Sequence, residues 1–320
     1  MSGDYLPVDL TRLKTYSIRH RPHKFDVSGL AGLPAAGASF REWWDALPPQ
    51  LGAASLKAVA QAVVRARRAG RPVVLAMGAH LVKVGCSPII CDLIRRRIVT
   101  AVALNGATAI HDVEIATVGQ TSEEVADTIR DGSFGMVEET PAFFAEALAQ
   151  ARSPDLGLGA ALGDHLLATR PPQLQHSILA AAREARIPAT VHVAIGTDTI
   201  HMHPQIAASD LPRRSALDFQ LICSVAADLA PAAAGGPAGV WCNVGSAVLL
   251  PEVFLKAVAV ARNLGSNLDN LVTANFDMIR HYRPGENVIG RPVKKGNGHQ
   301  ITGHHEIMLP LFRQALLELM

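Results

Sequence analysis

The residues best suited to chemistry are densest between Val191 and Pro204, in the stretch VHVAIGTDTIHMHP. If residues 200–203 are extended, the side chains of His201 and His203 point to the same side, near Asp198. Two imidazoles beside a carboxylate can act as an acid–base pair near neutral pH. They can also bind a divalent metal, although no complete ligand set is visible. The alternative is that these histidines only make structural hydrogen bonds in a polar cleft.

A second group of ionisable residues lies near the C-terminus, where His304 and His305 precede Glu306. The segment that follows, residues 306–320, predicts a helix, so a ligand could meet the helix N-terminus at these histidines. The alternative is that they only cap the helix. No HExxH pattern is present, which excludes a zincin-type site.

A third group consists of His111, Asp112 and Glu114. Glu114 lies in an otherwise apolar stretch, VEIATVG. Burying a carboxylate without a partner is costly, so Glu114 must face solvent or have a partner. We expect one or more of the three residues to face the same cleft as Asp198.

The elements that must position these groups alternate, from Arg71 onward, between short apolar runs and helical segments. Such alternation is typical of a parallel sheet that helices cover on both faces. The sequence therefore predicts an α/β fold with a Rossmann-like, doubly wound parallel sheet. The runs predict buried strands at residues 72–77, 99–104, 189–195, 240–244 and 271–274.

Two regions are expected. Residues 1–50 predict a polar, basic N-terminal arm and a short helix that Ser39 and Glu42 open as a capping box. We expect the arm to lie on the body or on a neighbouring subunit, and residues 51–320 to form a single domain. Further local predictions are a loop at 78–85, a second capping box of Thr121 with Glu124, and a surface excursion at 151–172.

Polar residues follow five of the predicted strands. In a doubly wound sheet, ligands bind beyond the carboxyl ends of the strands, so these residues predict a ligand shelf. The alternative is that turns favour such residues for conformational reasons. Neither a GxGxxG fingerprint nor a P-loop is present. The shelf residues are Gly78–His80, Asn105–Gly106, Gly196–Asp198, Asn243 with Gly245–Ser246, and Thr273–Asn275.

Composition excludes several classes of protein. The chain of 320 residues has 30 Lys and Arg against 28 Asp and Glu, which argues against a polycationic nucleic-acid binder. No apolar stretch is long enough to cross a membrane, and no secretory core follows Met1. Four cysteines in this spacing form neither a disulfide framework nor a zinc knuckle. We therefore expect a cytoplasmic protein with reduced thiols that binds neither nucleic acid nor membrane.

In order and spacing, the strand-end segments resemble those of the deoxyhypusine synthase superfamily from about Arg71 to the C-terminus. The stretch GAHLVKVG at 78–85 resembles that family's first cofactor loop, and Asn105-Gly106-Ala107 its second turn. TDTIHMH at 197–203 resembles its Gly-Asp segment with a downstream His. VGSAV at 244–248 resembles its Gly-rich turn, Thr273-Ala274 its Thr-Ala contact, and Gly303–Glu306 its final turn.

The resemblance implies NAD bound at subunit interfaces, a homotetramer and a small-molecule substrate. The residues that it assigns to cofactor binding are Gly78, Ala79, His80, Asn105, Gly106, Gly245, Ser246, Thr273, Ala274, His304 and His305.

Three positions depart from the family pattern. Leu249 aligns with the lysine that carries the aminobutyl group as an imine, so that covalent step is lost. His304 replaces the ribose-facing Asp, and His80 replaces an Asn. The stretch from Asn105 to Glu114 also resembles the ornithine cyclodeaminase type of this fold, which uses NAD to oxidise and re-reduce a carbon bearing an amine.

Together these features predict an NAD-dependent enzyme that transfers hydride at an amine- or hydroxyl-bearing carbon of a small polar metabolite. Asp198, His201 and His203 would form the substrate pocket, with one His as general base. His111, Glu114, His304 or Glu306 would supply the remaining groups. Two alternatives stay open: a metal-dependent lyase or hydrolase that uses His201, His203 and His304, and a non-catalytic binding protein, which Leu249 favours.

Overall fold

The computed structural model describes residues 5–320, and its centre is a parallel sheet. Its strands stand in the order β3-β2-β1-β4-β5-β6, and every neighbouring pair is parallel. This is the doubly wound order, so the predicted fold class is confirmed. The strands are β1 (Val73–Met77), β2 (Ala101–Asn105), β3 (Ala189–His192), β4 (Val240–Val244), β5 (Val272–Asp277) and β6 (Gly298–Thr302).

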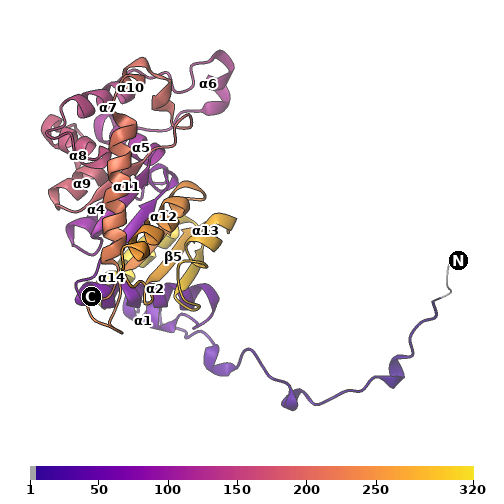
Figure 1. Cartoon of the computed structure of the whole chain (residues 1–320). Helices are drawn as coiled ribbons and strands as arrows, with labels where there is room; N and C mark the ends of the chain where they lie inside the picture. The colour runs from indigo at the N-terminus through magenta and orange to yellow at the C-terminus, as the bar shows by residue number, and fades with distance from the viewer. Residues whose placement is uncertain (1–4) are drawn as a thin grey trace.

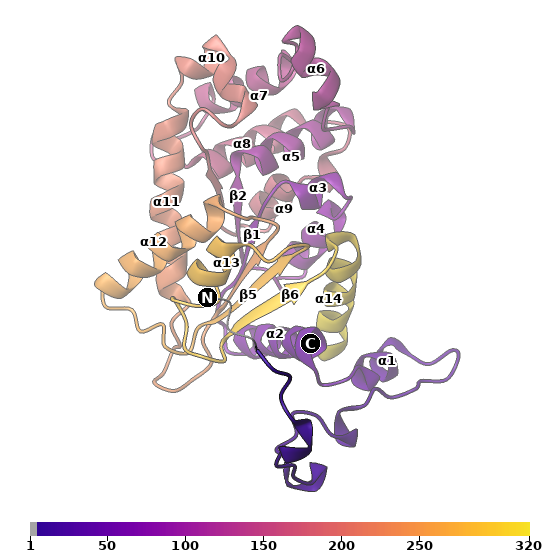
Figure 2. The same ribbon diagram turned by 90° about the vertical axis from the view of Figure 1, so that its right-hand side faces the viewer.

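Helices cover both faces of the sheet, because alternate residues of a strand point to opposite faces. In β1, Val73, Leu75 and Met77 join one hydrophobic core, whereas Val74 and Ala76 join the other. The first core is covered by α2 (Leu51–Arg68), α4 (Ser87–Arg95), α9 (Ile178–Glu184) and α14 (His305–Leu319). The second is covered by α11 (Leu211–Asp228) and α12 (Leu249–Asn263) (Figures 1 and 2).

Further helices gather beyond the carboxyl ends of β2 and β3, at the end of the molecule where Figure 1 labels α6, α7 and α10. They are α5 (Gly106–Val118), α6 (Val125–Asp131), α7 (Glu139–Ala149), the 3-10 helix η5 (Thr199–Met202) and α10 (Pro204–Ala207). The helix α8 (Leu158–Thr169) packs on β3. The short helices α3 (His80–Lys83) and α13 (Tyr282–Asn287) follow β1 and β5, and η4 (Leu174–His176) precedes α9.

The surface excursion predicted at residues 151–172 is wrong. That stretch contains α8, and Leu158, Leu162 and Leu166 of this helix are buried at the i, i+4 spacing of a core-facing stripe. Gly159 of this helix is a contact point. A Cβ on it would lie 2.2 Å from the carbonyl oxygen of Ala189. Close packing of a helix on β3 therefore explains the glycine.

Other local predictions were partly wrong. The capping box of Ser39 and Glu42 is confirmed, and it opens α1 (Phe40–Ala46). The second capping box does not form, because α6 begins after Glu124 and Thr121 bonds elsewhere. The predicted loop at 78–85 contains α3. The strand predicted to end at Ala274 continues to Asp277, and β6 at the edge of the sheet was missed because its GHQIT sequence is mostly polar.

The N-terminal arm leaves the body instead of lying on it (Figure 1). It contains three 3-10 turns, η1 (Leu10–Arg12), η2 (Ile18–His20) and η3 (Val27–Gly29). The side chains of Asp9, Ser17 and Asp26 cap these turns. Of the helices within residues 5–320, none is long and apolar enough to cross a membrane.

Candidate functional site

The switch point of the sheet lies between β1 and β4, and two glycines follow these strands. A Cβ on Gly78 would lie 2.0 Å from the carbonyl oxygen of Gly245, so a side chain there would collide with backbone. Gly245 has φ of +63°, and a Cβ on it would lie 2.8 Å from Nε2 of His305. Glycine is therefore required at both positions. In a sheet of this order, ligands bind at this point.

His305 lies against this pair of glycines at the first residue of α14. Its side chain is 1% exposed, yet neither ring nitrogen has a hydrogen-bond partner within residues 5–320. Burial lowers the pKa of His305, which favours the neutral ring, while the nearby Asp277 acts in the opposite direction. Buried polar groups are nearly always hydrogen-bonded, so the two nitrogens of His305 are candidate contacts for a ligand.

The other predicted cofactor residues of this part of the sheet lie close by. His80 stands 6.0 Å from His305 between ring centroids. His304 is the N-cap residue of α14 and is 64% exposed, with Nδ1 3.7 Å from Oε1 of Glu306. Ser246 is buried, and its Oγ accepts a hydrogen bond of 3.2 Å from the backbone amide of Leu250. Ala79 precedes α3 directly.

The structure does not bring Thr273 and Ala274 to this edge. Both are fully buried near the amino end of β5, and the Thr273 hydroxyl donates to the carbonyl of Val288 at 2.8 Å. The expectation that they follow a strand is wrong. Asp277 ends β5 instead, is 6% exposed and accepts a hydrogen bond from the amide of Met278. This carboxylate was not predicted from the sequence, because Asn275 interrupts the apolar run before Phe276 and Asp277.

Asp198 lies at the carboxyl end of β2, against the N-terminus of α5. Its Oδ2 accepts a hydrogen bond of 3.0 Å from the amide of Ala194, and a Cβ on Gly106 would lie 2.1 Å from the same oxygen. Burial raises the pKa of Asp198, while the amides of Ala194 and Ala107 and the imidazole of His201 counteract this. Asn105 caps α5 by accepting from the amide of Thr108 at 2.8 Å. The structure thus joins Asp198 to the Asn105–Gly106 turn.

His201 and His203 do not share one side, so that prediction is wrong. The backbone at Thr199–Met202 is a 3-10 helix, in which residues two apart point in different directions. Nε2 of His203 lies 2.9 Å from the carbonyl oxygen of Gly135, to which it donates. Both ring nitrogens of His201 are buried without a partner among the described residues.

No metal-ligand set forms from these residues. Across residues 5–320, no group of three or more His, Cys, Asp or Glu side chains could hold a metal ion. The trio of His201, His203 and His304 that the sequence left open is therefore not assembled.

Glu114 has partners, as the cost of burial requires. The hydroxyl of Thr121 donates to Oε2 of Glu114, and the hydroxyl of Thr140 donates to Oε1 at 3.0 Å. Nδ1 of His111 lies 2.5 Å from the Thr121 oxygen and 3.4 Å from Oε2. Burial would raise the pKa of Glu114, but these hydrogen bonds outweigh it and lower the pKa. Glu114 is therefore ionised at neutral pH.

We expect replacement of Thr121 by valine to cost roughly 1–3 kcal/mol of stability, because it leaves two buried partners unsatisfied. The network stabilises the fold while Glu114 is ionised, so its contribution is lost as pH falls through the lowered pKa. In urea unfolding, the difference between wild type and T121V should therefore shrink as pH falls below the usual pKa of a glutamate. The matched control, Thr128→Val on the exposed helix α6, should show little change at any pH.

Two residues noted in the sequence have structural roles. Asp112 is fully buried and accepts hydrogen bonds from the Ser177 hydroxyl and from the amides of Ile178 and Leu179, so it caps α9. Leu249 begins α12 and packs against the core of that face. Nothing at this position can replace the family's lysine.

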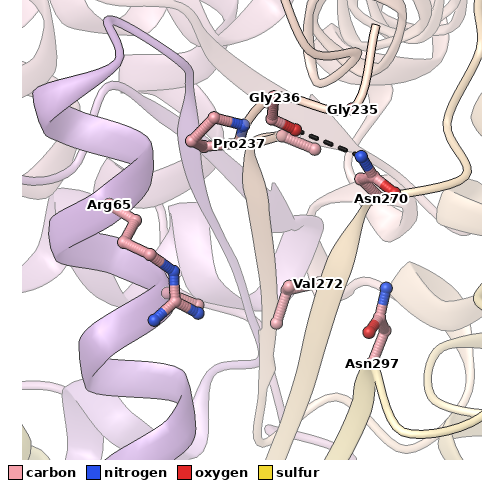
Figure 3. Close-up of a pocket in the computed structure, with 9 residues that line it drawn as sticks. Arg65, Gly235, Gly236, Pro237, Asn270, Val272 and Asn297 are labelled. Atoms are coloured by element: carbon pink, nitrogen blue, oxygen red, sulfur yellow. Dashed lines mark hydrogen bonds between the residues drawn. The ribbon is translucent and has the colours of Figure 1, made fainter.

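A cavity of about 420 Å³ lies at the opposite end of the sheet, by the amino ends of β4 and β5 (Figure 3). Figure 3 shows Arg65 of α2 on one side of it and Asn270 and Asn297 on the other, and the amide of Asn270 donates to the carbonyl of Gly236 at 3.1 Å. Arg65 is the one charged residue of its lining, and no acid–base group accompanies it. The cavity is therefore separate from the candidate site.

Known proteins resemble this chain in structure and not in sequence. No family model and no curated protein matches it. The complex of AgrE with ornithine and NAD+ has a TM-score of 0.54 at 13% identity over 83% of this chain and 33% of AgrE. The apo arginine dihydrolase ArgZ of the cyanobacterial ornithine–ammonia cycle has a TM-score of 0.51 at 13% identity, over 82% of this chain and 31% of ArgZ. A candidate deoxyhypusine synthase from Entamoeba histolytica has a TM-score of 0.51 at 10% identity, over 87% of this chain and 93% of that protein.

These similarities show that the chain has the deoxyhypusine synthase-like fold. It spans about a third of the length of AgrE and of ArgZ, and nearly the whole of the Entamoeba protein.

Proposed function

We propose that this protein is an NAD-dependent enzyme that transfers hydride at an amine- or hydroxyl-bearing carbon of a small polar metabolite. The observation that carries the proposal is the switch point. There the backbones of Gly78 and Gly245 meet without side chains, beside the unpartnered imidazole of His305. A solved neighbour of the same fold, AgrE, holds ornithine and NAD+.

The residues at the switch point fit a dinucleotide. The N-terminus of α14, a helix of 15 residues, offers backbone amides and a positive dipole to phosphate groups. His80 and His305 can donate to phosphate or hydroxyl oxygens. Asp277 supplies the carboxylate that usually accepts ribose hydroxyls, which compensates for His304. When bound, NAD would accept the hydride.

The residues near β2 fit the substrate. Asp198 would face a substrate ammonium, since an ionised carboxylate attracts a cation most strongly where water is excluded. His201 is next to Asp198 and would accept a proton, because both of its nitrogens are free. The linked His111 and Glu114 lie about 8–12 Å further along α5, at 1.5 Å per residue. Glu114 would hold the imidazole of His111 in one orientation beside the substrate.

The test is to denature freshly purified protein and analyse the released small molecules by mass spectrometry, with metals counted on the same sample. We expect NAD or NADH near one per subunit, or saturable binding when NAD is added. Bound metal without nucleotide would contradict the NAD-dependent function and favour a metal-dependent lyase or hydrolase. A protein that neither releases nor binds NAD would contradict the proposal.

A pair of variants isolates the role of His305. We expect His305→Leu to weaken NAD binding at least tenfold, measured by fluorescence titration with NADH. His165→Leu is the matched control, because His165 of α8 is also buried but packs on Phe143, with Nε2 3.5 Å from Oε2 of Glu146, away from the switch point. Equal NADH affinity in the two variants would exclude His305 from the nucleotide site.

A further inference from the structure

The arm, residues 5–34, leaves a series of large apolar side chains uncovered. Gly29 is its one buried residue. Surfaces of this kind mark interaction sites, because the free energy falls when a partner covers exposed apolar groups. The exposed residues, between 51% and 99% accessible, are Tyr5, Leu6, Val8, Leu10, Leu13, Tyr16, Ile18, Phe25, Val27, Leu30 and Leu33.

A second uncovered segment, which we call the α6 segment, comprises residues 119–139. Its helix α6 buries no residue. Val125 and Ile129 lie one turn apart on this helix and are 44% and 59% exposed, and Met136 and Val137 beyond it are also exposed. A helix of two turns is not stable in water by itself. The apolar face of helix α6, like the arm, is therefore left uncovered in one chain.

The two uncovered segments carry opposite charge. The arm has five cations, Arg12, Lys14, Arg19, Arg21 and Lys24, against two carboxylates. The α6 segment has six carboxylates, Glu123, Glu124, Asp127, Asp131, Glu138 and Glu139, against one arginine. None of these charges forms an ion pair within residues 5–320. Complementary charge of this kind steers and orients association.

We propose that the arm of one protomer docks on the α6 segment of a second copy of this chain. The arm is fixed to its own body near α1, where the amide of Gly32 donates to the carbonyl of Ala46 at 2.9 Å. From there it runs away from the body, and α6 lies at the opposite end of the molecule (Figures 1 and 2). If each protomer docks its arm on the other, the contact closes with two-fold symmetry.

Cross-linking of the full-length protein tests which copy receives the arm. Isotopically heavy and light protein are mixed in equal amounts and treated with a carbodiimide, which joins an amine to a contacting carboxylate. We expect cross-links from Lys14 or Lys24 to carboxylates of the α6 segment, in peptide pairs of mixed label. Once the subunits have exchanged, single-label pairs without any mixed pairs would show that the arm folds back on its own body, and no cross-links to the α6 segment would show that it docks elsewhere; either result overturns the proposal.

Charge reversal tests the chemistry of the contact. We expect Arg19→Glu with Arg21→Glu, and separately Asp127→Lys with Glu138→Lys, to weaken self-association at least tenfold by light scattering in low salt. A mixture of the two reversed proteins should associate again. The matched control, Arg152→Glu with Lys295→Glu, reverses two exposed cations outside the arm and should change nothing. Unaltered self-association in the arm variant, or a wild type that is monomeric throughout, would overturn the proposal.

Discussion

Replacement of Gly78 by alanine is expected to destabilise the protein by roughly 3 kcal/mol or more and to abolish nucleotide binding. A Cβ there would lie 2.0 Å from the carbonyl oxygen of Gly245, which is backbone and cannot rotate away. The turns after β1 and β4 would have to separate, and the amide of Gly78 would lose its hydrogen bond of 2.9 Å to the carbonyl of Val244. The change therefore acts at the switch point itself.

Urea unfolding and NADH titration of the same preparation measure both effects. The matched control is Gly285→Ala in α13, where a Cβ would meet nothing within 4 Å. An alanine in an open helical position stabilises slightly if it changes anything. Wild-type stability in G78A would contradict the close approach of the two turns. If G78A also kept wild-type NADH affinity, the nucleotide would not bind at the switch point.

The fold could be predicted largely from the pattern of apolar runs, for a reason visible in β1 and β4. Both are buried on both faces, so every residue except Asn243 is apolar, and five such runs with helices between them leave few other architectures. β6 was not predicted, because it lies at the edge of the sheet and its sequence contains Gly, His and Gln. The boundary of β5 was placed early because Asn275 looked like a strand end, whereas it is buried and bonded to Asn243 and Gln300.

The site could be predicted as a set of strand ends, but not as an arrangement of side chains. Positions such as Gly78, Gly106 and Gly245 follow from the order of segments along the chain. The separation of His201 from His203 depends on a 3-10 turn that no local signal marks. The partners of Glu114 come from Thr121 and Thr140, which lie 7 and 26 residues away. Long-range contacts of this kind are set by packing, which a single sequence does not show.

Replacement of Asp198 by asparagine is expected to lower kcat/KM about 100-fold while leaving NADH affinity near that of wild type. The substitution keeps an oxygen that can accept from the amides of Ala194 and Ala107, so the turn should survive. It removes the charge that would pair with a substrate ammonium, and losing one partner of a buried charge pair costs roughly 2–5 kcal/mol. NADH formation with a panel of amino and hydroxy compounds would identify the wild-type substrate and measure the loss.

Two further results would distinguish the charge of Asp198 from its shape. Because burial raises its pKa, activity of the wild type should rise with pH as Asp198 ionises, and this limb should be absent from the residual activity of D198N. Asp198→Glu should not rescue activity, since the carboxylate already lies against Gly106, where a Cβ would approach it to 2.1 Å. Full activity in D198N would instead show that Asp198 only supports the turn, and His201 would then be the remaining candidate for contact with the substrate.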